Sequence, residues 1–165
     1  MDGLKRSFPP VVDAGTRVLV LGSLPGEESL ARAQYYANPR NQFWRLIGAV
    51  IGADVAALPY EARLRALLAA GVGLWDTVGS ATRRGSLDGN IRDVSANDLA
   101  RLAERLPGLR AVGFNGGKSA AMGAKQLSGH PELALVPLPS SSPALTMAFG
   151  EKRARWMVLA QHLAD

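Results

Sequence analysis

The chain contains no cysteine and only two histidines, His130 and His162. Without cysteine, disulfides, thiolate zinc sites, iron–sulfur clusters and cysteine nucleophiles are excluded, and two histidines leave few nitrogen ligands for a metal. We therefore expect a function that needs neither a metal nor a cofactor. His130, which precedes Pro131, is interpreted as a surface residue rather than a catalyst.

Long apolar segments are also missing. No apolar run approaches the roughly 20 residues that cross a bilayer, and the N-terminal residues lack the apolar core of a secretory signal. These absences predict a cytoplasmic protein that makes no contact with a membrane.

Acidic residues are fewer than basic ones: 14 Asp and Glu stand against 19 Lys and Arg, which gives a formal net charge of +5. This balance favours an anionic partner such as nucleic acid, although a solvated basic surface explains it too. A chain of 165 residues buries roughly 70% of its unfolded surface and so has room for a substantial core. We expect one domain over residues 1–165, and a monomer.

Short apolar runs alternate along the chain with segments of helical periodicity. The first helix is expected only after Asn41, residues 76–93 are expected to form a polar loop, and Ser95 with Asp98 predicts a capping box. The alternation predicts an α/β fold whose parallel sheet is covered by helices on both faces. Strands are predicted at residues 18–21, 72–75, 111–114 and 133–138, and helices at 43–51, 61–70, 99–106, 116–125 and 156–163.

Segments that follow the strands are the expected ligand-binding places, because ligands in such folds bind at the carboxyl ends of the strands. The first of them, Gly-Ser-Leu-Pro-Gly at residues 22–26, has two glycines that allow close approach of a ligand to the backbone. It lacks the spacing and the lysine of a phosphate-binding loop. Taken alone, a tight turn explains it as well.

A cluster of aromatic residues surrounds Arg40 and Asn41 in a chain that is only 6% aromatic. Aromatic faces stack on bases, arginine binds phosphate, and asparagine can hold a water or read a base edge. Alternatively, Phe43 and Trp44 begin a helix and pack inward while Asn41 caps it. For Phe43 we prefer this second interpretation. The aromatic residues are Tyr35, Tyr36, Phe43 and Trp44.

Five motifs, in their order along the chain, closely resemble those of the hypoxanthine-DNA (deoxyinosine) glycosylase family, a branch of the uracil-DNA glycosylase superfamily. The resemblance runs from Phe8 to Trp156. It implies a three-layer α/β/α fold with a central, mostly parallel four-stranded sheet. It also implies hydrolysis of the N-glycosidic bond of a flipped-out base in DNA, without a metal. The motifs are Gly-Ser-Leu-Pro-Gly (22–26), Gln-Tyr-Tyr-Ala-Asn-Pro-Arg-Asn-Gln-Phe-Trp (34–44), Gly-Leu-Trp-Asp (73–76), Phe-Asn-Gly-Gly-Lys (114–118) and Leu-Pro-Ser-Ser-Ser-Pro-Ala (138–144).

The resemblance assigns the catalytic role to Asn41. In the uracil and mismatch-specific branches, an Asp or Asn that handles the attacking water stands at the position matching Leu24, whose apolar side chain cannot do so. In the hypoxanthine branch the important asparagine matches Asn41, which would position water against the anomeric carbon. Orientation and electrostatics can suffice for so weak a base, because glycoside cleavage passes through an oxocarbenium-like state.

Base-contacting roles also follow from the resemblance. Tyr36 would stack on the flipped base, and the amides around Gly22 and Ser23 would contact it. Asp76 could accept the N1–H of hypoxanthine or the N3–H of uracil, with a helix or turn cap as an equal alternative. Asn115 is expected to support the pocket or a phosphate.

The remaining assignments concern the DNA backbone. Arg40 and Lys118 are expected to contact phosphates, together with Ser140, Ser141 and Ser142 of the last motif. Leu138 stands where the uracil branch has a histidine that stabilises the leaving base, and Asn38 replaces the histidine common before proline in related sequences.

Two other functions remain compatible with the sequence: a hydrolase acting on free nucleosides or nucleotides, and a non-catalytic nucleic-acid-binding module. The preferred base is also open, because hypoxanthine, xanthine and uracil all present a carbonyl beside an N–H. The width of the pocket decides among them, and the motifs do not encode it.

Overall fold

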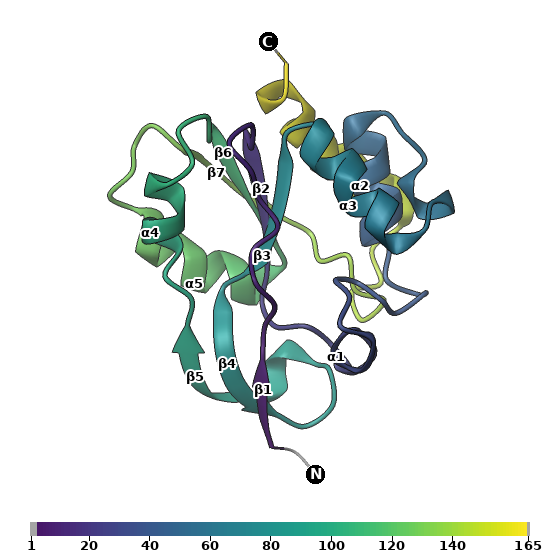
Figure 1. Ribbon diagram of the computed structural model, residues 1–165. Coiled ribbons are helices and arrows are strands. Elements are labelled where there is room, and N and C mark those ends of the chain that lie inside the picture. The colour runs from purple at the N-terminus through teal and green to yellow at the C-terminus, as the bar shows by residue number, and fades with distance from the viewer. Residues whose placement is uncertain (1–2, 165) are drawn as a thin grey trace.

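The computed structural model describes residues 3–164, with a parallel four-stranded sheet at the centre (Figure 1). The strands lie in the order β3-β2-β6-β7. Every residue of β2 and of β6 is buried, which explains why they appear in the sequence as short apolar runs without alternation. All four predicted strands are confirmed. Their bounds are Val18–Gly22 (β2), Val72–Asp76 (β3), Ala111–Asn115 (β6) and Ala134–Leu138 (β7).

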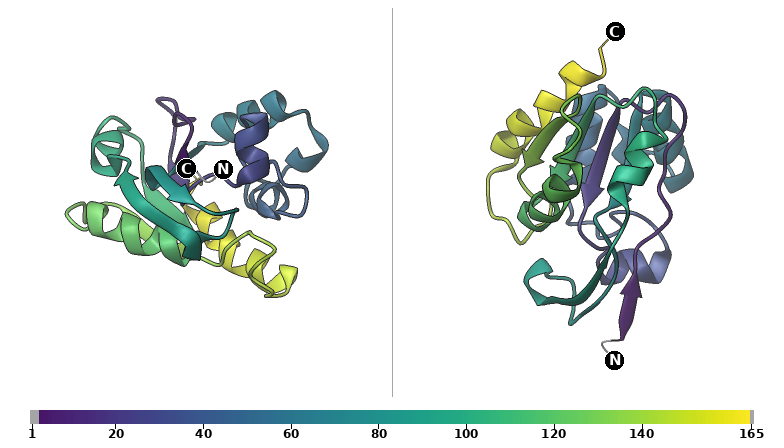
Figure 2. Two further views of the ribbon diagram at one scale, coloured as in Figure 1. Left: turned by 90° about the horizontal axis from the view of Figure 1, so that it is seen from below. Right: turned by 90° about the vertical axis from the view of Figure 1, so that its left-hand side faces the viewer.

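Helices cover both faces of this sheet (Figures 1 and 2). On one face lie α2 (Phe43–Ile51), α3 (Tyr60–Ala69) and α6 (Phe149–Trp156), with the short 3₁₀ helices η1 (Val55–Ala57) and η3 (Met157–His162). On the other lie α4 (Leu99–Glu104) and α5 (Gly117–Leu127). The predicted three-layer α/β/α fold is therefore confirmed.

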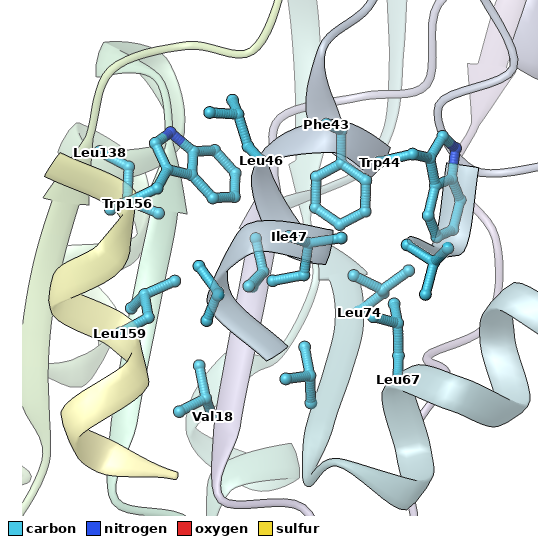
Figure 3. Packing of buried hydrophobic residues seen from close by; sticks show 14 of the residues in the cluster. Val18, Phe43, Trp44, Leu46, Ile47, Leu67, Leu74, Leu138, Trp156 and Leu159 are labelled. Carbon is cyan, nitrogen blue, oxygen red and sulfur yellow. The ribbon is translucent and has the colours of Figure 1, made fainter. Parts of the chain in front are cut away.

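Side chains of β2 alternate between two separate cores. Val18 and Val20 belong to the larger core, whereas Leu19 and Leu21 belong to the core under α4 and α5. Figure 3 shows the larger core, in which Phe43 and Trp156, both fully buried, meet edge to face with ring centroids 5.8 Å apart. Phe43 is thus a core residue, as expected.

The prediction that residues 76–93 form a loop is wrong. They contain β4 (Val78–Arg83) and the 3₁₀ turn η2 (Asp88–Asn90), and β5 (Ile91–Ala96) begins there. Together with β1 (Leu4–Arg6), these strands form a second, antiparallel sheet in the order β1-β4-β5, at the lower end of the molecule in Figure 1. Its strands bury few apolar residues and its register is interrupted twice, so the period-two signal of a strand is weak.

The helical predictions need three further corrections. A helix, α1 (Glu27–Arg32), precedes Asn41; it has six residues and buries only Ser29, too little for a periodic pattern. Ser95 lies exposed in β5 and forms no capping box, and Asp98 alone caps α4 by accepting from the backbone N–H of Arg101 (3.1 Å). The closing helix begins earlier than predicted and changes to 3₁₀ geometry after residue 156.

Candidate active site

A cavity of about 470 Å³ lies at the point in the sheet where the strand order reverses. β2 has β3 on one side and β6 on the other, so the segments leaving their carboxyl ends diverge and leave a crevice. Every predicted site residue except Lys118 lines it. These residues are Gly22, Ser23, Tyr36, Arg40, Asn41, Asp76, Asn115, Ser140, Ser141 and Ser142.

Gly22, the last residue of β2, makes room for two polar side chains. A Cβ atom at Gly22 would lie 2.6 Å from Oδ1 of Asp76 and 3.0 Å from the hydroxyl oxygen of Tyr36. The first distance is shorter than a carbon atom tolerates, and the second is a tight contact. The absence of a side chain at Gly22 therefore lets Asp76 and Tyr36 converge over the strand end.

Asp76 ends β3, directly beside Gly22, and is 3% exposed. Neither of its carboxyl oxygens accepts a hydrogen bond from another residue of the described chain, and Oδ2 is fully buried. The alternative that Asp76 caps a turn through its side chain therefore finds no support. Burial, reinforced by the charge of Asp88 and opposed by Arg83, raises the pKa of the Asp76 carboxyl to about 7.

Tyr36 is held rigidly beside this carboxyl. Its backbone has a left-handed φ of 53°, and one face of its ring stacks on Phe43, with centroids 3.9 Å apart and planes 14° from parallel. Trp44 donates from its indole to the carbonyl of Tyr36 (3.0 Å). Burial raises the pKa of the Tyr36 hydroxyl, as does the charge of Asp76, so the ring presents a neutral hydroxyl to the cavity.

The side chain of Asn41 caps a helix, and the residue also lines the cavity. Its Oδ1 accepts from the backbone N–H of Phe43 (2.9 Å), so the side chain caps the start of α2. The residue nevertheless lines the cavity, and its Nδ2 makes no hydrogen bond to another residue within 3–164. A carbonyl oxygen has a second lone pair. The cap thus orients the amide while leaving it able to bind a water.

Asn115 ties three parts of the site together. Its Nδ2 donates to the hydroxyls of Ser141 (2.9 Å) and Tyr36 (3.3 Å), and its Oδ1 accepts from the backbone N–H of Ser141 (2.9 Å). The carbonyl of Ser141 in turn accepts from the backbone N–H of Gln42 (3.0 Å). Because these bonds use both protons of Nδ2 and one lone pair of Oδ1, Asn115 mainly shapes the cavity.

The serine segment after β7 is also ordered by its own hydrogen bonds. Ser140 Oγ accepts from the backbone N–H of Ser142 (3.1 Å), and Ser142 Oγ accepts from that of Ala144 (3.1 Å). The buried ammonium of Lys152 donates to the carbonyl of Ser142 (3.2 Å). This segment forms one wall of the cavity. Lys118, in contrast, lies in the first turn of α5, outside the cavity lining.

Sequence reasoning missed the opposite wall, which the β4–β5 connection supplies. Asp88 lines the cavity and accepts from the Ser23 hydroxyl (2.5 Å). The buried guanidinium of Arg83 donates to the carbonyls of Leu24 and Pro25, which attaches this hairpin to the first loop. The sequence signal for this wall is the polar run Ser-Leu-Asp-Gly-Asn at residues 86–90, a composition typical of loops.

Two observations bear on cofactors and membranes. Within residues 3–164, no three His, Cys, Asp or Glu side chains gather as ligands for a metal ion. Over the same residues, no helix is both long and apolar enough to span a bilayer.

A family model of the uracil DNA glycosylase superfamily matches residues 9–163. The chain belongs to this superfamily. This member is 40% identical over 159 residues to a hypoxanthine DNA glycosylase of Methanosarcina acetivorans, covering 96% of this chain and 99% of that protein. It is 45% identical over 115 residues to a hypoxanthine DNA glycosylase of Methanosarcina barkeri, covering 70% and 73% of the two chains.

Solved structures give the same result for this superfamily member. Its fold matches the solution NMR structure of a uracil DNA glycosylase candidate from Methanosarcina acetivorans, with a TM-score of 0.86 and 39% identity over 98% of this chain and 99% of the other. The resemblance seen in the five motifs is therefore confirmed.

Proposed function

We propose that this protein is a monofunctional DNA glycosylase that hydrolyses the N-glycosidic bond of a deaminated base, with hypoxanthine as the foremost substrate. The observation that carries the proposal is the convergence of Gly22, Tyr36, Asn41 and Asp76 on one cavity of about 470 Å³. That volume falls within the roughly 300–1,000 Å³ of small-ligand sites. Two relatives with hypoxanthine in their names support the choice of base.

The cavity is suited to a nucleotide that has left the base stack. An enzyme that acts on a base must extrude it from the duplex and bind it in a pocket. Phe43 covers only one face of the Tyr36 ring, so we assign the cavity side of Tyr36 to stacking on the base. Gly22 and Ser23 would contact the base through their backbone, and Asp76 would bind its polar edge.

Hydrolysis requires a water at the anomeric carbon, and we assign its orientation to Asn41. The hydrogen bond that the backbone N–H of Phe43 donates to Oδ1 of Asn41 fixes the amide, so water can be held without loss of side-chain freedom during the reaction. The developing oxocarbenium-like charge reduces the need for a strong base.

Contacts with the DNA backbone are assigned to residues around the mouth. Arg40 is exposed there, and Ser140, Ser141 and Ser142 form the adjoining wall. Lys118 would reach a phosphate outside the cavity. The net charge of +5 supports attraction to DNA. We also propose that the protein acts as a monomer, because one chain supplies every residue of the site; sedimentation analysis tests this. A cytoplasmic location stays a prediction.

Excision assays test the proposal. A labelled duplex with a single deoxyinosine is incubated with the protein, heated in alkali, and compared with duplexes that carry deoxyuridine or deoxyxanthosine. We expect strand cleavage with deoxyinosine and none with Asn41→Ala. Absence of cleavage with all three bases would refute the glycosylase. Hydrolysis of free inosine would favour a nucleoside hydrolase, and salt-sensitive binding without cleavage a non-catalytic module.

A further inference from the structure

Two carboxyl groups from different parts of the chain line the cavity together. Asp76 ends β3 in the central sheet, and Asp88 begins η2 in the hairpin of the second sheet. They differ in their hydrogen bonds. Asp88 accepts from the Ser23 hydroxyl (2.5 Å), whereas no donor among the described residues reaches either oxygen of Asp76. Asp88 is therefore equipped to carry a charge and Asp76 is not.

Other polar and charged groups near Asp76 do not neutralise it. The charge of the Arg83 guanidinium opposes the rise in the pKa of Asp76, but its hydrogen bonds go to the carbonyls of Leu24, Pro25 and Gly85. Burial raises the pKa of the Tyr36 hydroxyl and keeps it neutral, and Glu27 and Glu28 of the cavity lining are acids like Asp76. A buried carboxylate without a donor is unfavourable, so this setting favours the carboxylic acid.

When the N-glycosidic bond breaks, its electron pair stays on the departing base. A proton donor at the base stabilises the developing negative charge and so lowers the activation free energy. Histidine often serves as such a donor, yet neither His130 nor His162 lines the cavity. Asp76 is a buried acid of the cavity lining whose carboxyl group makes no hydrogen bond within the described residues. Its position beside Gly22, at the carboxyl ends of the paired strands β2 and β3, places it in the lining of the cavity that an inserted base would enter.

We propose that Asp76 acts as a carboxylic acid on the leaving base, and that Asp88 is the positioning residue that keeps it protonated. This inference rests on the proposed glycosylase function. It predicts a substrate class, because the O–H of the acid can donate to the carbonyl oxygen that deamination creates, which is O6 in hypoxanthine. Xanthine and uracil offer a carbonyl oxygen of the same kind.

The bond between the anomeric carbon and N9 breaks, and its electron pair stays with the base, where it is delocalised toward O6. The proton of Asp76 moves to that oxygen, and the oxygen of water forms a bond to the anomeric carbon. The proton released by the water passes to solvent, from which Asp76 is protonated again. The products are an abasic sugar and neutral hypoxanthine.

Titration of the free protein provides the first test, independent of activity. We expect the ¹³C-carboxyl signal that disappears in Asp76→Asn to titrate near pH 7. Asp88→Asn removes the neighbouring charge and should move this midpoint to lower pH. Asp93→Asn, a change at an exposed aspartate of β5 in the same hairpin, serves as the matched control and should leave it unchanged. A midpoint near 4 in the wild type would overturn the inference.

Single-turnover excision of hypoxanthine provides the second test. An acid with a pKa of about 7 loses its proton above that pH, so the rate should fall about fivefold between pH 7 and pH 8. Asp88→Asn should shift this fall to lower pH. Asp76→Asn keeps a donor and an acceptor but has no acidic proton, so it should lose the pH dependence and be slower by roughly 10² or more.

The results of these tests distinguish a failure of the Asp76 acid from a failure of the glycosylase function. Excision by the wild type at a rate independent of pH, or at an unchanged rate by Asp76→Asn, would refute the acid and leave the glycosylase standing. Unchanged pH dependence in Asp88→Asn would refute the role of Asp88. Absence of any excision, with the titration as expected, would refute the glycosylase and the acid together.

Discussion

Replacement of Asp76 by asparagine is expected to stabilise the fold at alkaline pH while removing activity. The folded protein holds the pKa of this carboxyl at about 7, against an ordinary value of 3.8. Between these values the folded state binds the proton more tightly than the unfolded state. The free energy of unfolding therefore falls as pH rises through this window.

The magnitude follows from the difference of about three pKa units. Each unit corresponds to about 1.36 kcal/mol, so the charged form of Asp76 destabilises the fold by roughly 4 kcal/mol once pH is well above 7. Roughly 2–3 kcal/mol of this change should appear between pH 5 and pH 8. Asparagine has nearly the same shape and does not titrate, so it should avoid the whole loss.

Urea unfolding at pH 5 and pH 8 measures this effect. The stability advantage of Asp76→Asn over the wild type should grow between the two values, whereas that of the control Asp93→Asn should stay constant. A stability advantage that is the same at both pH values would show that Asp76 is solvated in the folded protein and that burial does not raise its pKa. Loss of activity with gain of stability is typical of a residue kept for function.

Three further changes test the site. Asn41→Ala should abolish excision and, by removing the helix cap, lower the free energy of unfolding by about 1 kcal/mol; wild-type excision would contradict the assignment. Gly22→Ala places a methyl group 2.6 Å from Oδ1 of Asp76, so base binding should weaken at least tenfold in a fluorescence titration with a deoxyinosine duplex. Unchanged affinity would show that Asp76 can move aside without loss of binding. Arg40→Ala should reduce the slope of log affinity against log salt by about 1, measured by the same titration; an unchanged slope would remove Arg40 from the phosphate contacts.

Prediction from sequence succeeded where local pattern and burial coincide. The strand Val18–Gly22 is buried along its whole length, so its apolar run is unmistakable. The helix Phe43–Ile51 has an apolar stripe because six of its nine residues are buried. Prediction failed for Val78–Arg83 and Ile91–Ala96, since a hairpin that buries little leaves no periodic trace.

Among the residues of the candidate site, some could likewise be predicted from the sequence and others could not. Residues at the carboxyl ends of the parallel strands, such as Gly22, Asp76 and Asn115, were identified because the order of strands and loops implies where those ends meet. Asp88 was not identified. It reaches the cavity only through pairing of β4 with β5 and through the bonds of Arg83 to the first loop, and both contacts join residues far apart in sequence.

The sequence by itself determined the layered fold, the superfamily, and the set of polar residues at the strand ends, because these depend on patterns along the chain. Only the tertiary structure decided what those residues can do. It committed the Asn115 amide to Ser141 and Tyr36, gave Asn41 a cap that also orients it, and left Asp76 buried without a donor beside Asp88. Protonation and hydrogen bonding depend on the groups that surround a side chain in space, and most of those groups come from elsewhere in the chain.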